Sequence, residues 1–180
     1  QYSNYEIDFN KPFHKESMFD LLEKYMDVDM REMDLPQLQE IAKNKSFSLQ
    51  PDLNYGQALD KIFGEFVEPN LIEPIFVTDY PKAISPLAKE SRDGDKNTVE
   101  RFELFIAGME IANSFSELND PLEQRRRLED QVKLRELGDE EAHQLDTNYI
   151  EAMEIGMPPT GGVGIGIDRI VMLLLMQESI

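Results

Sequence analysis

Apolar residues recur every three or four positions along the first third of the chain, a spacing typical of helices that bury one face. A helix is predicted near residues 17–26, where Ser17 stands before the first apolar residue and can serve as the N-cap. The pattern stays helical between Asp27 and Glu68, with a polar interruption at residues 44–54. Four methionines at helical spacing are expected to fill the core of this region: Met18, Met26, Met30 and Met33.

Strands are indicated where β-branched and aromatic residues stand between turn signals. Residues 1–13 alternate loosely and predict a short strand that ends at the turn of Lys11 and Pro12. The run PIFVTDY at Pro74–Tyr80 predicts another strand. The polar stretch Lys89–Asn97 then reads as a loop, and strands resume at Val99.

Two further helices are predicted in the second half of the chain. Pro121–Leu137 is rich in helix formers, and Asp120 is available as its cap. Its run Arg125–Arg127 is expected to be a solvated helix face rather than a phosphate site. A helix over Thr147–Ile155 is expected to end before the glycine and prolines that follow it.

Composition narrows the classes of partner and of metal ligand. The 180 residues are 41% hydrophobic and contain no cysteine, so any metal must be held by oxygen or imidazole ligands. Eighteen basic residues against 36 acidic ones give a net charge of −18, which repels a phosphate backbone at long range. The longest apolar stretch, Ile170–Met176, is too short to span a membrane, so we expect a soluble protein. The absence of cysteine is compatible with a reducing, cytoplasmic setting.

The segment RFELFIAGMEIANSFSELND at Arg101–Asp120 predicts an acidic β-hairpin. A two-residue turn at Ala107 and Gly108 places Ile106 opposite Met109 and Phe105 opposite Glu110, and then Leu104 opposite Ile111 and Glu103 opposite Ala112. Glu103 and Glu110 then share a face and can hold one or two hard cations. The competing interpretation is two surface glutamates on a solvated strand.

The next residues of this strand leave a question of geometry open. Strict alternation sends Asn113, Phe115 and Glu117 to the face opposite Glu110. Either they serve a different site, or a bulge near Ala112 returns them to the same pocket. If they converge, two acceptors and an apolar wall would suit a cationic amino group on a short alkyl chain.

A glycine-rich strand leads into the last predicted helix. Thr160–Asp168 reads TGGVGIGID, and Gly162, Gly164 and Gly166 leave one strand face without side chains. Such a face lets a flat ring or a phosphate approach the backbone. Asp168 is the expected helix cap, and Arg169 in the first helical turn can aim its guanidinium at a phosphate or stack it on a base. Close helix–sheet packing explains the glycines about as well.

Glu103 and Glu110 around a turn, NSFSELND at Asn113–Asp120 and GVGIGIDR at Gly162–Arg169 together resemble the class II aminoacyl-tRNA synthetases, and within that class the lysyl-tRNA synthetase family. The resemblance covers essentially the whole chain. It implies an α+β fold, an antiparallel sheet flanked by helices. A small helical insertion is expected at about residues 14–68, and the sheet with the class's third motif at residues 74–180.

The resemblance also implies roles for the motif residues. Glu103 and Glu110 would bind magnesium on ATP, and Arg169 would contact the nucleotide and act in catalysis beside Gly164 and Gly166. The lysine pocket would be lined by Asn113, Phe115 and Glu117. The implied reaction activates lysine with ATP to lysyl-adenylate and transfers it to tRNA(Lys).

Other parts of the family pattern are not found in these residues. We find no first or second class II motif and no anticodon-binding barrel. We therefore expect a fragment of a homodimeric enzyme that binds tRNA(Lys) through other regions and is inactive by itself. Two alternatives remain open: a shorter relative that attaches a lysine-type amino acid to a translation elongation factor, and a non-catalytic binding module of the same fold. His14 and His143 are expected to have no chemical role.

Overall fold

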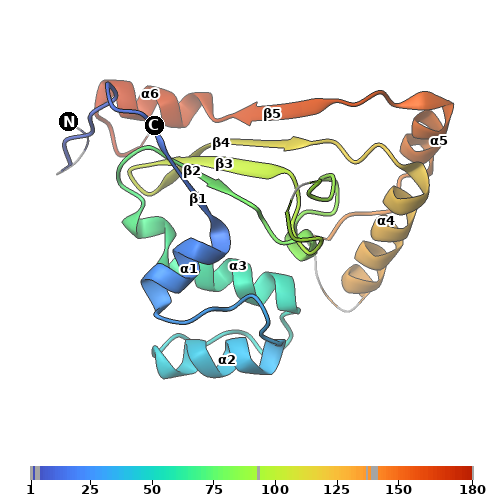
Figure 1. The fold of residues 1–180 in the computed structure, drawn as a ribbon, viewed down its shortest axis with the longest axis horizontal. Coiled ribbons are helices and arrows are strands. Elements are labelled where there is room, and N and C mark those ends of the chain that lie inside the picture. Colours follow the sequence, from blue (N-terminus) through green and yellow to red (C-terminus); the bar gives the residue numbers. More distant parts are fainter. Residues whose placement is uncertain (1, 3–4, 93, 137, 139–141, 180) are drawn as a thin grey trace.

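The computed structural model describes residues 2, 5–92, 94–136, 138 and 142–179. In this part of the chain five strands form one sheet in the order β1-β2-β3-β4-β5 (Figure 1). The first two strands run parallel, and each later strand runs antiparallel to the one before it. The strands are β1 (His14–Ser17), β2 (Ile75–Thr78), β3 (Arg101–Ile106), β4 (Met109–Ser116) and β5 (Gly161–Ile165).

The helices gather in three places around the sheet (Figure 1). The first three lie together on one side of it, the next two stand at the end of β4, and the last follows β5 at the opposite end. The expected α+β class, with a largely antiparallel sheet flanked by helices, is confirmed. The helices are α1 (Met18–Met26), α2 (Leu35–Asn44), α3 (Tyr55–Phe66), α4 (Pro121–Glu136), α5 (Thr147–Gly156) and α6 (Ile167–Leu175), with short 3₁₀ turns η1 (Glu68–Asn70) and η2 (Lys82–Ile84).

Side-chain caps explain where the first helices begin. Ser17 accepts a hydrogen bond from the backbone N–H of Asp20, which confirms its predicted role as the N-cap of α1. Asp34 and Asn54 begin α2 and α3 with reciprocal capping boxes, in which the glutamine three residues on bonds back to the backbone of the cap. These local bonds satisfy N–H groups that the helices themselves leave unpaired.

One hydrophobic core joins α1, α2 and α3 to the sheet. Phe63 of α3 packs edge-on against Phe105 of β3, with ring centroids 6.2 Å apart. The methionines of this region confirm their expected role: Met18, Met26 and Met30 are buried in the core, and Met33 packs against it. Because helices and strands share this core, the division of the chain at about residue 68 stays a prediction.

The predicted turn between β3 and β4 is confirmed. Ala107 and Gly108 have φ angles of 54° and 73°. Two consecutive positive φ angles are typical of the type I′ turn, whose twist matches that of the flanking strands. The turn also contacts the segment before β2, because the N–H groups of both turn residues donate to the carbonyl groups of Ile72 and Leu71.

A bulge in β4 changes the predicted register beyond Phe105. The first two predicted pairs of the hairpin are observed, but Leu104 lies opposite Ala112 and Glu103 lies opposite Asn113. The predicted partners, Ile111 and Ala112, are therefore each wrong by one residue. Ile111 is the extra residue, since β4 advances by two positions while β3 advances by one. This is the bulge near Ala112 that the sequence left as one of two possibilities.

Two other predictions about element ends are wrong. The described residues of the segment 1–13 contain no strand, and β1 instead begins at His14, after Pro12. Its pairing partner decides this, because β1 forms through parallel hydrogen bonds to β2. At the other end, α6 begins one residue before Asp168, so Gly166 occupies the N-cap position without a side-chain bond. The predicted end of α4 at Leu137 lies outside the described residues.

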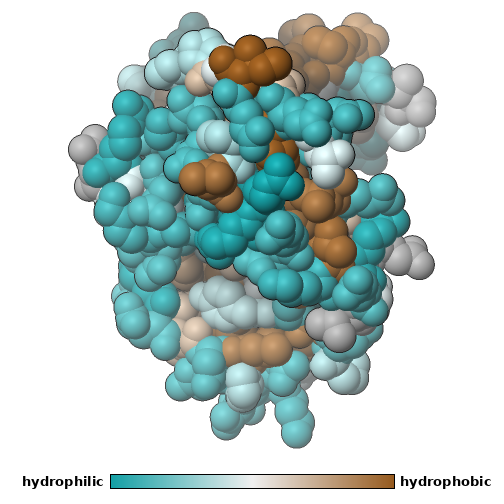
Figure 2. Space-filling model, turned by 90° about the vertical axis from the view of Figure 1, so that its right-hand side faces the viewer, coloured by the Kyte–Doolittle hydropathy of each residue, from teal (hydrophilic) through white to brown (hydrophobic). Residues whose placement is uncertain are grey.

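Hydrophilic side chains cover most of the end of the molecule that carries α4 and α5, with a few separate hydrophobic patches (Figure 2). The arginine run of α4 is only partly solvated, contrary to the prediction. Arg126 is exposed, but the side chain of Arg127 is only 6% exposed. Its Nη1 donates to the carbonyl of Ala88 at 2.8 Å, because α4 packs against that loop. Among the described residues, no helix has both the length and the apolar composition needed to cross a membrane.

Candidate functional site

The strand register brings most of the predicted site residues to one face of the sheet. Residues that lie opposite each other on neighbouring strands share a face. Phe105 lies opposite Glu110 near the turn, and beyond the bulge the same face continues across three strands. It presents Arg101, Glu103, Asn113, Phe115, Gly162 and Gly164.

Glu103 is the most enclosed acidic residue of this face. Its side chain is 11% exposed, and its two carboxylate oxygens are bound by different partners. Oε2 accepts a hydrogen bond of 2.6 Å from the hydroxyl of Tyr80, and Oε1 accepts one from Nη2 of Arg101. Burial raises the pKa of Glu103, while Arg101 and Tyr80 oppose that change. The two partners therefore stabilise a charge that burial alone would disfavour.

Glu110 and Arg169 meet on the turn side of the bulge. Nη1 of Arg169 donates to the backbone carbonyl of Glu110 and lies 3.5 Å from its Oε2. Both side chains are accessible, with 49% of Arg169 and 39% of Glu110 exposed. Arg169 lies in the first turn of α6, as predicted, so the helix start directs its guanidinium back over β4. This pair is open to a ligand.

A third carboxylate, that of Glu68, lies near Glu103 and Glu110. Burial, together with the charges of Asp60, Glu103 and Glu110, raises the pKa of Glu68 to about 7. Glu68 begins η1, and only Val67 separates it from the end of α3. The acidic part of the site is therefore larger than the two glutamates of the hairpin.

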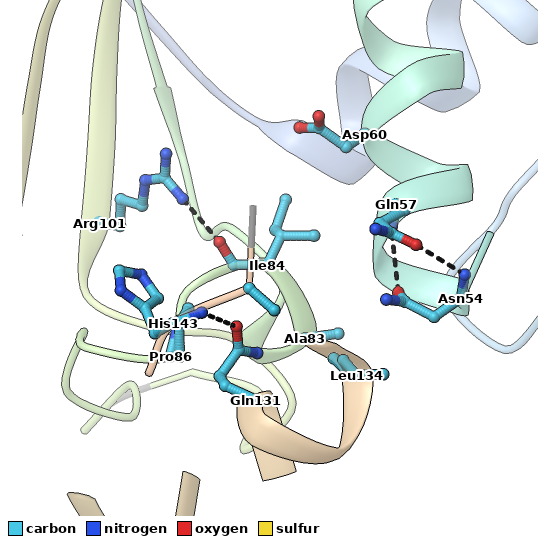
Figure 3. Close-up of a pocket in the computed structure, with 11 residues that line it drawn as sticks. Asn54, Gln57, Asp60, Ala83, Ile84, Pro86, Arg101, Gln131, Leu134 and His143 are labelled. Carbon is cyan, nitrogen blue, oxygen red and sulfur yellow. Dashed lines mark hydrogen bonds between the residues drawn. The ribbon is translucent and has the colours of Figure 1, made fainter. Parts of the chain in front are cut away.

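Two cavities lie beside Arg101 and His143. One of about 220 Å³ is also lined by Asn113, Phe115 and the loop of residues 84–88. A second, of about 290 Å³, shares Arg101 and His143 but is closed on its other side by α3. Figure 3 shows these two residues across this second cavity from the side chains of α3. The guanidinium of Arg101 therefore lines both cavities.

The glycine-rich strand β5 lies against Glu117, the third residue predicted to line the lysine pocket. A Cβ added at Gly162 would lie 2.6 Å from Oε1 of Glu117, so the missing side chain makes room for that carboxylate. At Gly164 the nearest atom to an added Cβ is the carbonyl oxygen of Asn113, 3.9 Å away. Burial raises the pKa of Glu117. The bare strand face therefore accommodates a protein carboxylate at Gly162 and remains open at Gly164.

The chemistry of the donor set fits a magnesium ion carried by a nucleotide. Mg²⁺ prefers carboxylate oxygens, and with nucleotides it uses one or two of them together with phosphates and water. Each oxygen of Glu103 accepts one hydrogen bond and keeps a further lone pair, and Glu110 is accessible. Among the residues that the structure describes, no cluster of three or more side chains suited to a metal is found.

The whole chain matches a known family. The family model described as "tRNA synthetases class II (D, K and N)" matches residues 1–180. The chain belongs to this family of class II tRNA synthetases. The resemblance seen in the sequence motifs is thereby confirmed.

Several curated relatives of this class II synthetase chain carry the name "Lysine--tRNA ligase". The protein of Porphyromonas gingivalis is 47% identical over 174 residues, which are 97% of this chain and 30% of that protein. The protein of Christiangramia forsetii is 45% identical, with coverages of 99% and 31%. That of Prochlorococcus marinus is 48% identical, with coverages of 99% and 35%. The chain thus spans about a third of the length of these relatives.

The structure of this class II synthetase chain adds residues that the sequence did not single out. Arg101 and Tyr80 bind the two oxygens of Glu103, and His143 lines both cavities although no role was expected for it. The sequence did contain a signal for Arg101, because it stands two residues before Glu103, and residues two apart on a strand share a face. Neither Tyr80 nor His143 could be found that way, since both reach the site from loops far away in the sequence.

Proposed function

We propose that the chain is part of the catalytic domain of a lysine–tRNA ligase, which activates lysine with ATP and transfers it to tRNA(Lys). The bulge at Ile111 carries this proposal, because it sets Asn113 and Phe115 on the same face as Glu103 and Glu110. One face then offers acceptors for an ammonium group, an apolar wall and oxygen donors for a metal–nucleotide complex. The high similarity to lysine–tRNA ligases supports the same assignment.

In the proposed site Glu117 and Asn113 bind the amino group and polar atoms of lysine, and Phe115 contacts its alkyl chain. The raised pKa of Glu117 reflects burial without a cation, and a lysine ammonium would stabilise the ionised carboxylate. Asp and Asn side chains, the other substrates suggested by the family description, carry no cation for Glu117 to pair with.

Glu103 and Glu110 hold the magnesium ion of ATP, and Gly164 and Gly166 allow the nucleotide close to the backbone. The metal, when bound, neutralises phosphate charge. Arg169 donates to the nucleotide from the first turn of α6 and acts in catalysis by stabilising charge on the phosphates.

The first chemical step needs no protein base. The ionised carboxylate of lysine attacks the α-phosphorus of ATP, the bond to the bridging oxygen breaks, and pyrophosphate leaves. A ribose hydroxyl of the tRNA then attacks the carbonyl carbon of the adenylate, loses its proton, and AMP leaves. The residues of this face contribute orientation and charge stabilisation.

We place the full-length enzyme in the cytoplasm as a homodimer that binds tRNA(Lys) through other regions.

Pyrophosphate exchange by the full-length protein tests this function. Exchange should depend on lysine and not on aspartate or asparagine. Glu117→Gln should raise the KM for lysine by about tenfold or more, because it removes the charge that pairs with the ammonium group. Glu151→Gln, at an exposed position of α5, is the matched control and should leave KM unchanged. Exchange with aspartate or asparagine in place of lysine would refute the assignment.

A further inference from the structure

Arg101 binds residues of two different parts of the proposed site at once. Its side chain is 17% exposed, and its Nε donates to Oδ1 of Asn113 at 3.2 Å. Nη2 of the same guanidinium donates to Oε1 of Glu103. A single planar group thus contacts a residue proposed to bind lysine and a residue proposed to bind the metal.

The guanidinium is itself held in one orientation. Nη1 donates to the carbonyl of Ile84 at 3.0 Å, a bond visible in Figure 3, and to Oγ of Ser85 at 2.9 Å. Its central carbon lies 4.6 Å from the ring centroid of Tyr80. The same tyrosine donates its hydroxyl to Oε2 of Glu103. Arg101, Tyr80 and Glu103 therefore form a closed set of contacts, and the loop at Ile84 and Ser85 anchors it.

A guanidinium has only donors and does not lose its charge in proteins, so it dictates how its partners are turned. It requires that the carbonyl oxygen of the Asn113 amide face Arg101, which directs the NH₂ group of that amide away from Arg101. Asn113 lines the cavity of about 220 Å³, and an amide oxygen has two lone pairs, so Oδ1 can accept a second hydrogen bond there from an ammonium group. On Glu103, Arg101 and Tyr80 each bind one oxygen and so hold the carboxylate in a single rotamer.

We propose that Arg101 is a positioning residue that couples the amino-acid pocket to the metal carboxylate, by holding Asn113 and Glu103 in their binding orientations through one guanidinium. This rests on the proposed function of the face. A lysine in its place would supply one compact charge on a flexible stem, which cannot reach Asn113, Glu103, Ser85 and Ile84 together. The geometry therefore requires arginine and not only a positive charge.

The test uses the full-length protein with lysine, ATP and magnesium. In Arg101→Lys, the KM for lysine and the magnesium concentration for half-maximal exchange should both rise, each by about tenfold. Arg127→Lys is the matched control, since Arg127 is also a buried arginine that binds a glutamate and a backbone carbonyl. It should lower thermal stability to a similar extent and change neither parameter.

A purely structural role for Arg101 gives a different result. Arg101→Lys would then resemble the control, with less active enzyme but unchanged KM and magnesium dependence, and the proposal would be overturned. A double-mutant cycle adds a second criterion, because Arg101 acts through Asn113. The effect of Arg101→Lys on the KM for lysine should shrink in an Asn113→Ala background, whereas independent effects would contradict the coupling.

Failure of the proposed function is distinguishable from failure of this inference. If the wild-type protein shows no lysine-dependent exchange, the proposed function and the role of Arg101 both fall. If the wild type is active and Arg101→Lys keeps its lysine and magnesium dependence, only the role of Arg101 falls.

Discussion

At the scale of single residues, Gly162 has no side chain, and this leaves room for the carboxylate of Glu117. A Cβ at Gly162 would lie only 2.6 Å from Oε1 of Glu117, so the carboxylate fills the space that a side chain would need. The atom that would be displaced is the far end of a flexible side chain. An added methyl group can therefore be accommodated if the carboxylate moves, so a substitution here should affect binding more than folding.

We predict that Gly162→Ala raises the KM for lysine of the full-length protein by about tenfold, since it displaces the carboxylate that we propose pairs with the ammonium group. Its melting temperature should change little. Gly161→Ala is the control, because a Cβ there meets only the carbonyl oxygen of Phe115, at an ordinary 3.8 Å. Steady-state pyrophosphate exchange and thermal unfolding of both variants check this. An equal KM for the two would contradict the role of Gly162.

At the scale of elements, the β3–β4 hairpin carries a conformational strain at its turn. Ala107 has a φ angle of 54°, in the left-handed region that costs residues with a Cβ more than it costs glycine. Gly108, at 73°, has the residue type that this conformation favours. Its absent Cβ also faces the carbonyl oxygen of Glu68 at 3.4 Å.

Substitutions at these adjacent turn residues should therefore have opposite effects on stability. Ala107→Asn should stabilise the chain by about 0.5–1 kcal/mol, because asparagine tolerates the left-handed conformation better than alanine. Gly108→Ala should destabilise it by at least about 1 kcal/mol. Urea unfolding of the two variants measures both values. Two changes of the same sign would show that the turn is not the type I′ turn described here.

The docking of α4 depends on a carboxylate that is shared by two arginines. Glu123 accepts hydrogen bonds from Arg126 at 2.8 and 2.9 Å and from Arg127 at 2.7 Å. These bonds hold the pKa of Glu123 at about 2, below its ordinary value of 4.5, and the bonds from Arg126 have the largest effect. The carboxylate thus links an exposed arginine to the buried one that reaches Ala88.

A lowered pKa in the folded state means that Glu123 stabilises the fold while it is ionised. The contribution is full above the ordinary value of 4.5 and is lost as the pH falls toward 2. Glu123→Gln should therefore lower the free energy of unfolding by about 1 kcal/mol at pH 7, and this difference should shrink below pH 4.5. Urea unfolding at several pH values checks it. Glu129→Gln, at an exposed position of the same helix, should show no such trend.

At the scale of the whole molecule, charge limits what these 180 residues bind by themselves. The net charge of −18 repels ATP and tRNA alike. The two site cations are already engaged, Arg101 with Glu103 and Arg169 with Glu110. The matched relatives are about three times as long as this chain.

We predict that the isolated 180 residues catalyse no lysine-dependent pyrophosphate exchange above background, whereas the full-length protein does. The reason is that too little positive charge faces the triphosphate. The same assay on both proteins, at equal concentrations and saturating lysine, decides this. Activity in the isolated chain would show that the described face is sufficient for activation.

Most residues of the candidate site were named from the sequence, but their placement on one face depended on a bulge that the sequence left open. The position of the turn and the pairing of Phe105 with Glu110 follow from β propensity and a glycine. Whether Asn113 and Phe115 join the acidic face depended on one inserted residue, Ile111, which no local pattern marks. The roles assigned to the individual site residues stay predictions.

The sequence by itself determined the features that depend on residues close together in the chain. These are the cap at Ser17, the cap at Asp120, whose Oδ1 accepts hydrogen bonds from the backbone N–H groups of Leu122 and Glu123, the hairpin turn and the motifs that identify the family. Tertiary structure alone decided the parallel pairing of β1, the burial of Arg127, the carboxylate of Glu117 over Gly162 and the contacts of Arg101. Each of these joins segments that are distant in sequence, in several cases by more than 30 residues. Hydrogen-bond partners and packing across such separations are chosen only when the sheet assembles, because local propensity contains no information about which distant group will face a given side chain.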